Sequence, residues 1–342
     1  MTIAFSIETS CDETSVAIVN DLGKIISQIT FNQLEHKKFG GVVPEIASRA
    51  HLQILQKIIP SCFKKTNLNI SDIDLFCATS GPGLIGGLLV GTTVAKSMAI
   101  GAGKPFYPIN HLEGHLISPA FNNKLKFPNL SLLLTGGHTQ IYLVKEPNNY
   151  KLLGETIDDA IGESFDKVAK LLGLSYPGGP EIEKLALNGN LNTFVLPHPL
   201  KNKKNINLSF SGIKPAVSLI VKKQKIIDQK FKENISASFQ NKIIEILSTK
   251  IEKVLEILEE KKINIYEIAI VGGVAANKAI RNSFSSAQNL NKFNFIYPPI
   301  ELCGDNAAMI ALACQHKYKN NVNPNNLFKA NPRLSIDEMN FS

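Results

Sequence analysis

The stretch Ser131–Val144, which reads SLLLTGGHTQIYLV, decides the fold. A mostly apolar run leads into Thr135-Gly136-Gly137-His138, and a run that alternates apolar and polar residues follows. This pattern predicts a strand, a tight glycine turn and a returning strand. Because glycine has no Cβ, backbone N–H groups at such a tip can approach a bound anion closely.

The same pattern begins the chain. Residues 3–19 read IAFSIETSCDETSVAIV, which again predicts strand, polar turn and strand. A third strand-like run follows each copy, at Lys24–Phe31 and at Tyr150–Thr156. A chain that repeats one three-stranded pattern is typical of a duplicated fold with two facing tips.

The segments after each copy predict helices and strands in alternation, which indicates α/β domains with covered sheets. Both halves have the order βββαβαβα, so we expect a first domain at 1–125, a second at 130–320 with a helical insertion at about 157–232, and a tail at 321–342 that wraps the surface. Two tandem units leave a cleft between them, a usual place for a nucleotide. The expected later helices are Pro44–Pro60, Leu84–Ile100, His111–Asn122, Ser236–Lys261, Asn277–Ala287 and Asp305–Lys317. The expected later strands are Ile73–Ser80, Pro105–Asn110, Ile265–Val271 and Phe293–Tyr297.

Composition places the chain among ordinary globular proteins, with 44% hydrophobic and 19% charged residues. A formal charge of +8 suits a polyanionic partner such as nucleic acid, although lysine is abundant along the whole chain. Five cysteines without a CxxC spacing predict reduced thiols in a cytosolic protein.

Membrane association is not expected. The chain opens on a strand without a basic leader, so we expect no signal peptide. The most apolar helix, Leu84–Ile100, is interrupted by Thr92, Thr93 and Lys96, and we expect it to be too short for a bilayer. The sequence therefore predicts a cytoplasmic protein.

His111 and His115 stand four residues apart in a helical segment, so both rings lie on one face. That spacing can hold one divalent metal, although two unrelated histidines near a helix start would show it too. Asp305 in CGDNAAM is the best candidate for a third ligand, and a plain helix N-cap is its ordinary alternative role. A zinc peptidase needs HExxH, whereas Glu113 in HLEGH lies about 200° around the helix from either histidine. We therefore reject peptidase activity.

Other motifs suggest ligand contacts that also have simpler explanations. Paired glycines in VGGVAAN, 271–277, let a flat ligand or a phosphate lie against the backbone, but an ordinary strand–helix turn has them too. Asp166 and Glu183 flank Gly178-Gly179-Pro180 and suit ribose hydroxyls, whereas most acids on helices are only solvated. In GPGLIGG no Lys-Ser/Thr pair follows, so it is not a P-loop, and Gly86, Gly87 and Gly91 are expected to permit close helix packing.

Taken together, the motifs resemble the TsaD family of the actin/hexokinase/Hsp70 (ASKHA) superfamily. These are the tRNA threonylcarbamoyladenosine synthases, once called O-sialoglycoprotein endopeptidases, and the resemblance covers nearly the whole chain in order. The motifs that carry it are IETSCDET, SGPGLIGGLLVG, NHLEGH, TGGHTQ, FDKVAKLLGLSYPGGP, SFSGIK, VGGVAAN and CGDNAAMIA.

The resemblance implies an ASKHA fold and transfer of a threonylcarbamoyl group from threonylcarbamoyl-AMP to the exocyclic amine of an adenosine. That adenosine lies just 3′ of the anticodon in tRNAs that read codons beginning with A. The resemblance assigns one divalent metal to His111, His115 and Asp305; this ligand set suits Fe(II), with Zn or Mg compatible. It assigns catalytic roles to Asp12 and Glu13 and makes ATP or AMP a ligand as well. Its substrate contacts fall on Leu133, Leu134, Thr135, Gly136, Gly137, Asp166, Gly179, Glu183 and Asn277.

The resemblance also implies tRNA as a partner, together with TsaB-like and TsaE-like proteins, while TsaC-type enzymes supply the adenylate. Solvated faces are the ordinary explanation of lysine clusters, but a tRNA enzyme predicts that some lysines hold the phosphate backbone. Three alternatives remain open: a metal-dependent small-molecule carbamoyltransferase, a sugar kinase and a non-catalytic ATP-binding scaffold of the same fold. The lysine clusters are Lys201–Lys204, Lys222–Lys225 and Lys261–Lys262.

Overall fold

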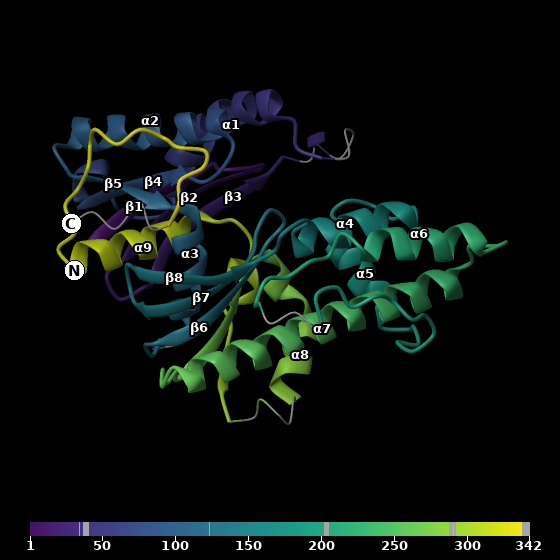
Figure 1. Cartoon of the computed structure of the whole chain (residues 1–342). Helices are drawn as coiled ribbons and strands as arrows, with labels where there is room; N and C mark the ends of the chain where they lie inside the picture. The colour runs from purple at the N-terminus through teal and green to yellow at the C-terminus, as the bar shows by residue number, and fades with distance from the viewer. Residues whose placement is uncertain are drawn as a thin grey trace. The chain divides into compact units, whose positions relative to one another are not determined.

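The computed structural model describes residues 1–33, 35–36, 41–122, 124–201, 205–286, 290 and 292–336 (Figure 1). The chain forms two compact units. The first consists of Met1–Leu125, Glu146–Tyr150 and Asp305–Ser342, and the second of Lys126–Lys145 and Lys151–Gly304. Ala287 at the end of an expected helix, Lys203 and Lys204 in a lysine cluster, and residues 337–342 of the expected tail lie outside the described residues.

The first unit contains a five-stranded mixed sheet in the order β3-β2-β1-β4-β5. Strand β1 pairs antiparallel with β2 and parallel with β4, which pairs parallel with β5. Helices α1 and α2 cover one face, while α9 packs against the strands from the other side (Figure 1). The strands are β1 (Ile3–Glu8), β2 (Glu13–Asn20), β3 (Ile25–Asn32), β4 (Leu75–Gly81) and β5 (Phe106–Asn110), and the helices are α1 (Pro44–Lys64), α2 (Ile85–Ala102), α3 (His111–Ile117) and α9 (Ala307–Lys319).

Large and small residues alternate along β1, so the two faces of the sheet offer different surfaces to the helices that cover them. Phe5 and Ile7 join the apolar core beneath α1 and α2. Ser6, on the opposite face, bonds through its Oγ to the Ala307 carbonyl at a distance of 2.6 Å. Successive side chains of a strand point to opposite faces, so small residues on one of them let α9 approach the sheet closely.

The second unit repeats the sheet, with the strand order β10-β9-β6-β7-β8. Strand β6 pairs antiparallel with β7 and parallel with β9, as β1 does with β2 and β4. The repeat predicted from the two hairpin patterns is therefore confirmed. The strands are β6 (Asn129–Leu134), β7 (Thr139–Glu146), β8 (Asn149–Glu155), β9 (Glu267–Val271) and β10 (Asn294–Ile296), and the helices are α4 (Ile161–Leu171), α5 (Gly178–Ala186), α6 (Ile213–Lys223), α7 (Gln229–Glu260) and α8 (Lys278–Ser286).

The last helix belongs to the first unit, although sequence order assigned it to the second domain. Helix α9 packs against β1, β2, β4 and β5, and the unit boundary falls between Gly304 and Asp305. The chain after it also follows the first unit, because the Asn325 N–H donates to the Phe106 carbonyl and the Asn331 N–H to the Ser80 carbonyl. Sequence order alone did not show this return.

Several element ends also differ from expectation. The helix expected at His111–Asn122 is shorter, because α3 ends at Ile117 and a 3₁₀ turn at Ser118–Phe121 follows. Helix α7 begins at Gln229 rather than Ser236, since Asp228 caps it by accepting from the Phe231 N–H. Such capping decides where a helix begins.

Gly87 and Gly91 pack α2 against the turn after β1, which confirms the close helix packing that the sequence predicted for them. A Cβ on Gly87 would lie 2.2 Å from the Thr9 carbonyl oxygen, and one on Gly91 would lie 2.2 Å from Thr9 Oγ1. By length and composition, α2 alone among the helices of the described residues could cross a membrane, so the expectation that it is too short was wrong. Its glycine face nevertheless packs against the sheet, as in a core helix.

We predict that Gly87→Ala lowers the free energy of unfolding by about 1–3 kcal/mol, because the new methyl group has no room beside Thr9. Gly101→Ala in the same helix is the matched control, since nothing lies within 4 Å of its added Cβ. There alanine should stabilise by roughly 0.5–1 kcal/mol through helix propensity. Denaturant unfolding followed by circular dichroism measures both, and equal effects would contradict the packing argument.

Candidate active site

The three candidate metal ligands converge within the first unit. Helix α3 starts directly after β5, and Asn110 caps it by accepting from the Leu112 N–H. His111 and His115 therefore stand one turn apart, with ring centroids 4.8 Å from each other. Asp305 Oδ1 lies 3.1 Å from His115 Nε2 and 3.5 Å from His111 Nε2. One potential ligand atom from each residue falls within a 4.8 Å group, so the three could hold one metal ion.

Asp305 is free for this role because its neighbour caps the last helix. The Asn306 side chain accepts from the Met309 N–H at 3.0 Å, and α9 then begins at Ala307. The sequence left Asp305 open between an N-cap and a ligand, and the structure gives the cap to Asn306. The carboxylate of Asp305 instead turns to the imidazole pair.

Glu8, at the end of β1, orients His111 by contacting its Nδ1 atom. Its Oε2 lies 3.1 Å from His111 Nδ1 and also accepts from the Thr79 hydroxyl, while its Oε1 accepts from the Ser10 N–H at 2.6 Å. A carboxylate on one imidazole nitrogen fixes the ring and raises the basicity of the other nitrogen. His111 Nε2 is thereby left to face Asp305.

In this cluster the carboxylates of Glu8 and Asp305 lie beside imidazole rings, and their proximity shifts the pKa of His111 and of Asp305. Burial disfavours a charged ring at His111, but the Asp305 and Glu8 carboxylates outweigh it and raise the pKa of His111 well above its usual value. Burial likewise opposes the charged form of Asp305, yet His111 and His115 bring its pKa well below the ordinary range. The pKa of His115 is lowered, chiefly by burial. An anionic carboxylate beside imidazoles is a suitable donor set for a divalent cation.

The polar turn between β1 and β2 ends at Asp12, and Glu13 is the first residue of β2. Burial is the first cause that raises the pKa of Glu13 well above its usual value, and the charges of Asp305 and Asp12 add to it. Burial also raises the pKa of the Cys11 thiol, as expected for an inert cysteine.

A chain of buried side chains braces this turn from α1. His51 Nε2 lies 3.0 Å from the Cys11 carbonyl oxygen, to which it donates, so its Nδ1 accepts from Gln33 Nε2 at 3.1 Å. His36 Nε2 in turn donates to Gln33 Oε1 at 2.9 Å. These linked hydrogen bonds hold the backbone of the turn in place.

Glu113 faces away from the candidate ligands, as its position on the helix predicted. Its side chain is buried, pairs with Lys317 Nζ at 3.1 Å and accepts from the Tyr150 hydroxyl at 3.3 Å. A peptidase base beside the metal is therefore absent at this position.

In the second unit, glycines bring three backbone segments together at the tip after β6. Gly272 has φ +93°, and a Cβ there would meet the Leu134 carbonyl at 2.5 Å; a Cβ on Gly162, at the start of α4, would meet Gly136 Cα at 2.8 Å. Beside this contact, Gly136, Gly137 and Gly273 have open space where a Cβ would stand. Leu133, Leu134 and Thr135 are buried, which leaves the exposed Gly136 and Gly137 as the accessible part of the tip.

The three polar residues expected to contact substrate in this unit each support a helix start. Asp166 accepts from the Gly178 N–H at the beginning of α5, and Glu183 accepts from the Lys278 N–H at the beginning of α8. Asn277 accepts from the Ile280 N–H, and its amide donates to Gln240 at 2.8 Å. Gly179 has open space beside it. Their roles as substrate contacts stay a prediction.

Sequence reasoning missed the residues that hold these groups in place. In the sequence, Glu8 is only an acid near the first tip, and His51 is only one position of an amphipathic helix. Asp158, which no motif singles out, anchors the SFSG motif through bonds from the Ser209 hydroxyl at 2.5 Å and the Phe210 N–H at 2.8 Å. These roles depend on contacts between distant segments, which no local pattern reports.

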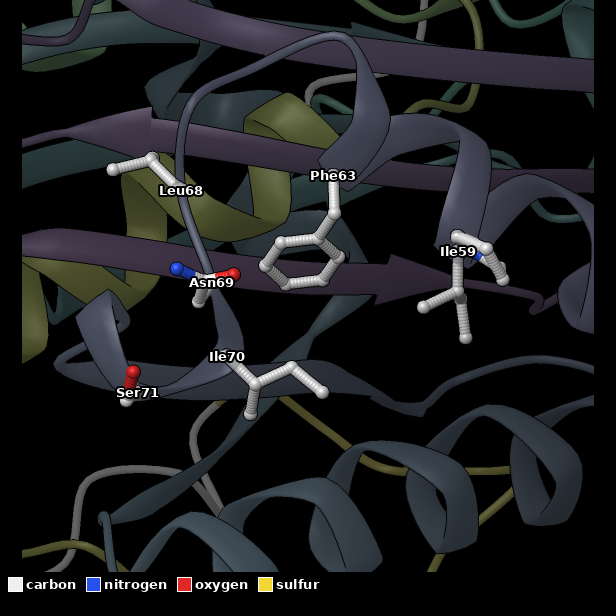
Figure 2. A pocket seen from close by; sticks show the side chains of 7 residues that line it. Ile59, Phe63, Leu68, Asn69, Ile70 and Ser71 are labelled. Atoms are coloured by element: carbon white, nitrogen blue, oxygen red, sulfur yellow. The ribbon is translucent and has the colours of Figure 1, made fainter.

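A hollow of about 500 Å³ lies elsewhere on the surface of the first unit. The side chains of the last turns of α1 and of the loop that follows line it, among them Ile59, Phe63 and Ile70 (Figure 2). It is lined by no titratable side chain and by none of the candidate site residues. It therefore lies outside the candidate active site.

Comparison with known proteins agrees with this architecture. HypF, solved in its phosphate- and nucleotide-bound form, superimposes with a TM-score of 0.59 at 13% identity, over 93% of this chain and 55% of that one. The tRNA N6-adenosine threonylcarbamoyltransferase of Thermosipho africanus is 46% identical over 98% of this chain and 100% of its own length. That of Wolbachia pipientis wMel is 46% identical over 98% of this chain and 99% of its own.

The two mixed five-stranded sheets with their repeated order define a duplicated α/β protein with an actin-like ATPase fold. The model of the TsaD family, tRNA N6-adenosine threonylcarbamoyltransferase, matches residues 24–312. The chain belongs to this family, and the resemblance read from its motifs is confirmed.

We predict that Glu8→Gln weakens divalent-metal binding about 10- to 100-fold, because the ring of His111 loses the carboxylate that fixes it. Calorimetric titration with Co(II) measures this. Glu45→Gln, which changes an exposed carboxylate on α1, is the control and should bind as the unaltered protein does. Equal affinity of both variants would exclude an orienting role for Glu8.

Proposed function

We propose that this chain transfers a threonylcarbamoyl group to the N6 amine of an adenosine in tRNA, the activity that its family name describes. Threonylcarbamoyl-AMP is the proposed donor, and the adenosine 3′ of the anticodon in tRNAs reading codons that begin with A is the proposed acceptor. The observation that carries the proposal is the group of His111, His115 and Asp305, which a non-catalytic scaffold of the same fold would not require.

We propose that these three residues hold one divalent ion, with Fe(II) the best fit to two imidazoles and a carboxylate, and Zn or Mg compatible with them. When bound, such an ion supplies Lewis acidity and a template for phosphate and carbonyl oxygens. Two features of the chain support this role. Glu8 fixes one imidazole at the nitrogen turned away from Asp305, and the Asp305 carboxylate is released from capping by Asn306.

In the proposed reaction, the polar turn that leads into β2 provides the group that accepts the proton lost by the adenosine amine. In the transfer, the amine nitrogen bonds to the carbonyl carbon, the bond to the phosphate oxygen breaks, and AMP leaves with that electron pair. Asp12 and Glu13 are the proposed groups that orient the amine or take its proton. The bond from His51 to the Cys11 carbonyl holds their backbone, which supports a fixed rather than adaptable position.

In the second unit, the exposed glycine turn at Gly136 and Gly137 is the proposed contact for the nucleotide. Backbone N–H groups at Gly136 and Gly137 would offset the charge that grows on the leaving phosphate. Leu133, Leu134 and Thr135 would form the strand end that supports this tip. Asp166, Gly179, Glu183 and Asn277 are the proposed ribose and adenine contacts, because carboxylates can accept hydrogen bonds from ribose hydroxyls.

For partners, we propose tRNA, a TsaB-like protein and a TsaE-like protein, in the cytoplasm. In the first unit, α2 presents Ile85, Leu89 and Ile100, which are 46%, 50% and 69% exposed and share one side of the helix. Exposed apolar side chains of this kind are a suitable surface for a protein partner. Co-purification with and without Leu89→Asp tests the contact.

We predict that His111→Ala and Asp305→Ala each abolish formation of the modified adenosine. The assay combines the metal-loaded protein, threonylcarbamoyl-AMP, an unmodified tRNA and the partner proteins, and detects the modified nucleoside by mass spectrometry. Small hydroxyl acceptors and ATP with sugars, run in parallel, test the carbamoyltransferase and kinase alternatives. Full activity in folded variants would refute the metal's role, and product only on a small acceptor would replace the tRNA proposal.

We predict that tRNA binding depends on the exposed lysines at the end of α6. Replacing Lys222, Lys223 and Lys225 by Gln should weaken binding and reduce the magnitude of the slope of log K against log salt by about 0.7–0.9 for each phosphate that is no longer neutralised. The control replaces Lys57, Lys64 and Lys65, which are exposed on or next to α1, so the net charge changes equally. Equal slopes in the two variants would contradict a specific role of the α6 lysines and would indicate only an effect of net charge.

A further inference from the structure

We infer that the buried ion pair between Glu113 and Lys317 is the positioning device that sets the two helices of the metal centre against each other. Glu113 lies on α3 between the two histidines, and Lys317 lies on α9, the helix that begins just after Asp305. Neither residue is a catalytic group or a ligand. The inference rests on the metal-dependent function proposed above.

The pair is almost completely enclosed. Glu113 is 1% exposed and Lys317 is 3% exposed. Lys317 Nζ lies 3.1 Å from Glu113 Oε2 and 3.4 Å from Asn148 Oδ1, while the Tyr150 hydroxyl donates to Glu113 Oε1 at 3.3 Å. Both charges therefore have partners of opposite sign or hydrogen-bonding partners, which burial of an ion requires.

The two helices touch at a second point. A Cβ on Gly114 would lie 2.9 Å from Ile310 Cδ1 and 3.0 Å from Met309 Cγ, so α3 sits directly on α9 there. Ile310 and Lys317 are seven residues apart, about two helical turns. One steric contact leaves a helix free to pivot, whereas a contact and an ion pair two turns away fix its direction.

The direction of α3 matters because the ligand atoms project from it. Glu113 faces about 200° away from His111 and His115, so the helix is held on one side and presents its imidazoles on the other. Metal–ligand distances tolerate only about 0.2 Å. A small rotation of α3 over α9 would move both imidazole nitrogens relative to Asp305, which is fixed at the start of α9.

The test separates positioning from stability. Glu113→Gln and Lys317→Met each leave one buried charge unpaired, and we expect each to weaken Co(II) binding at least about tenfold and to change the visible Co(II) absorption spectrum. Lys317→Arg keeps the charge and should stay close to the unaltered protein. The double variant Glu113→Gln/Lys317→Met leaves no unpaired buried charge, so its thermal stability should recover while its Co(II) affinity remains at least about tenfold low.

Each outcome bears on the inference. A folded double variant with unaltered Co(II) affinity and spectrum overturns it, because the pair would then only stabilise the fold. Folded single variants that bind as the unaltered protein does overturn it as well. If the unaltered protein binds no Co(II), the proposed metal centre fails and the inference fails with it. Glu45→Gln, at an exposed ion pair on α1, is the control for loss of charge alone.

Discussion

The rest of the first unit depends on one constraint. Helix α9, which lies near the C-terminal end of the chain, packs closely against the first sheet. Helix α9 is rich in alanine where it meets β1, and the facing residue Ser6 bonds to its first turn. Larger side chains at this interface would hold the helix away from the strands. Because α9 lies close, Asp305 at its start reaches two histidines that lie about 190 residues earlier in the sequence.

Around that contact, the donor set is organised in layers. The imidazoles and the Asp305 carboxylate form the inner group, Glu8 and Asn306 set the orientation of two of its members, and the Glu113–Lys317 pair connects the helices behind it. The layers have different tasks. The inner group needs lone pairs for a cation, whereas the outer ones need charges that compensate each other out of reach of water.

The sequence predicted much of this, because strands and amphipathic helices leave periodic patterns and glycine turns have a recognisable chemistry. It therefore placed His111 and His115 on one face and assigned close packing to Gly87 and Gly91. The N-cap of α9 was harder, since Asp305 and Asn306 are both good capping residues and only three-dimensional packing decides between them. The return of α9 to the first sheet and the role of Glu8 depend on contacts across a hundred residues or more, which no local pattern contains.

The division of the chain into units has a consequence for its synthesis. Residues 151–304 of the second unit form one continuous stretch, and Lys126–Lys145 just precede it, so the ribosome has released nearly all of that unit before Asp305 appears. The first unit, in contrast, needs α9 to cover one face of its sheet. During translation, which proceeds at roughly 5–20 residues per second, one face of the N-terminal strands therefore stays uncovered until α9 emerges. A nascent chain of this protein completes its second half before its first.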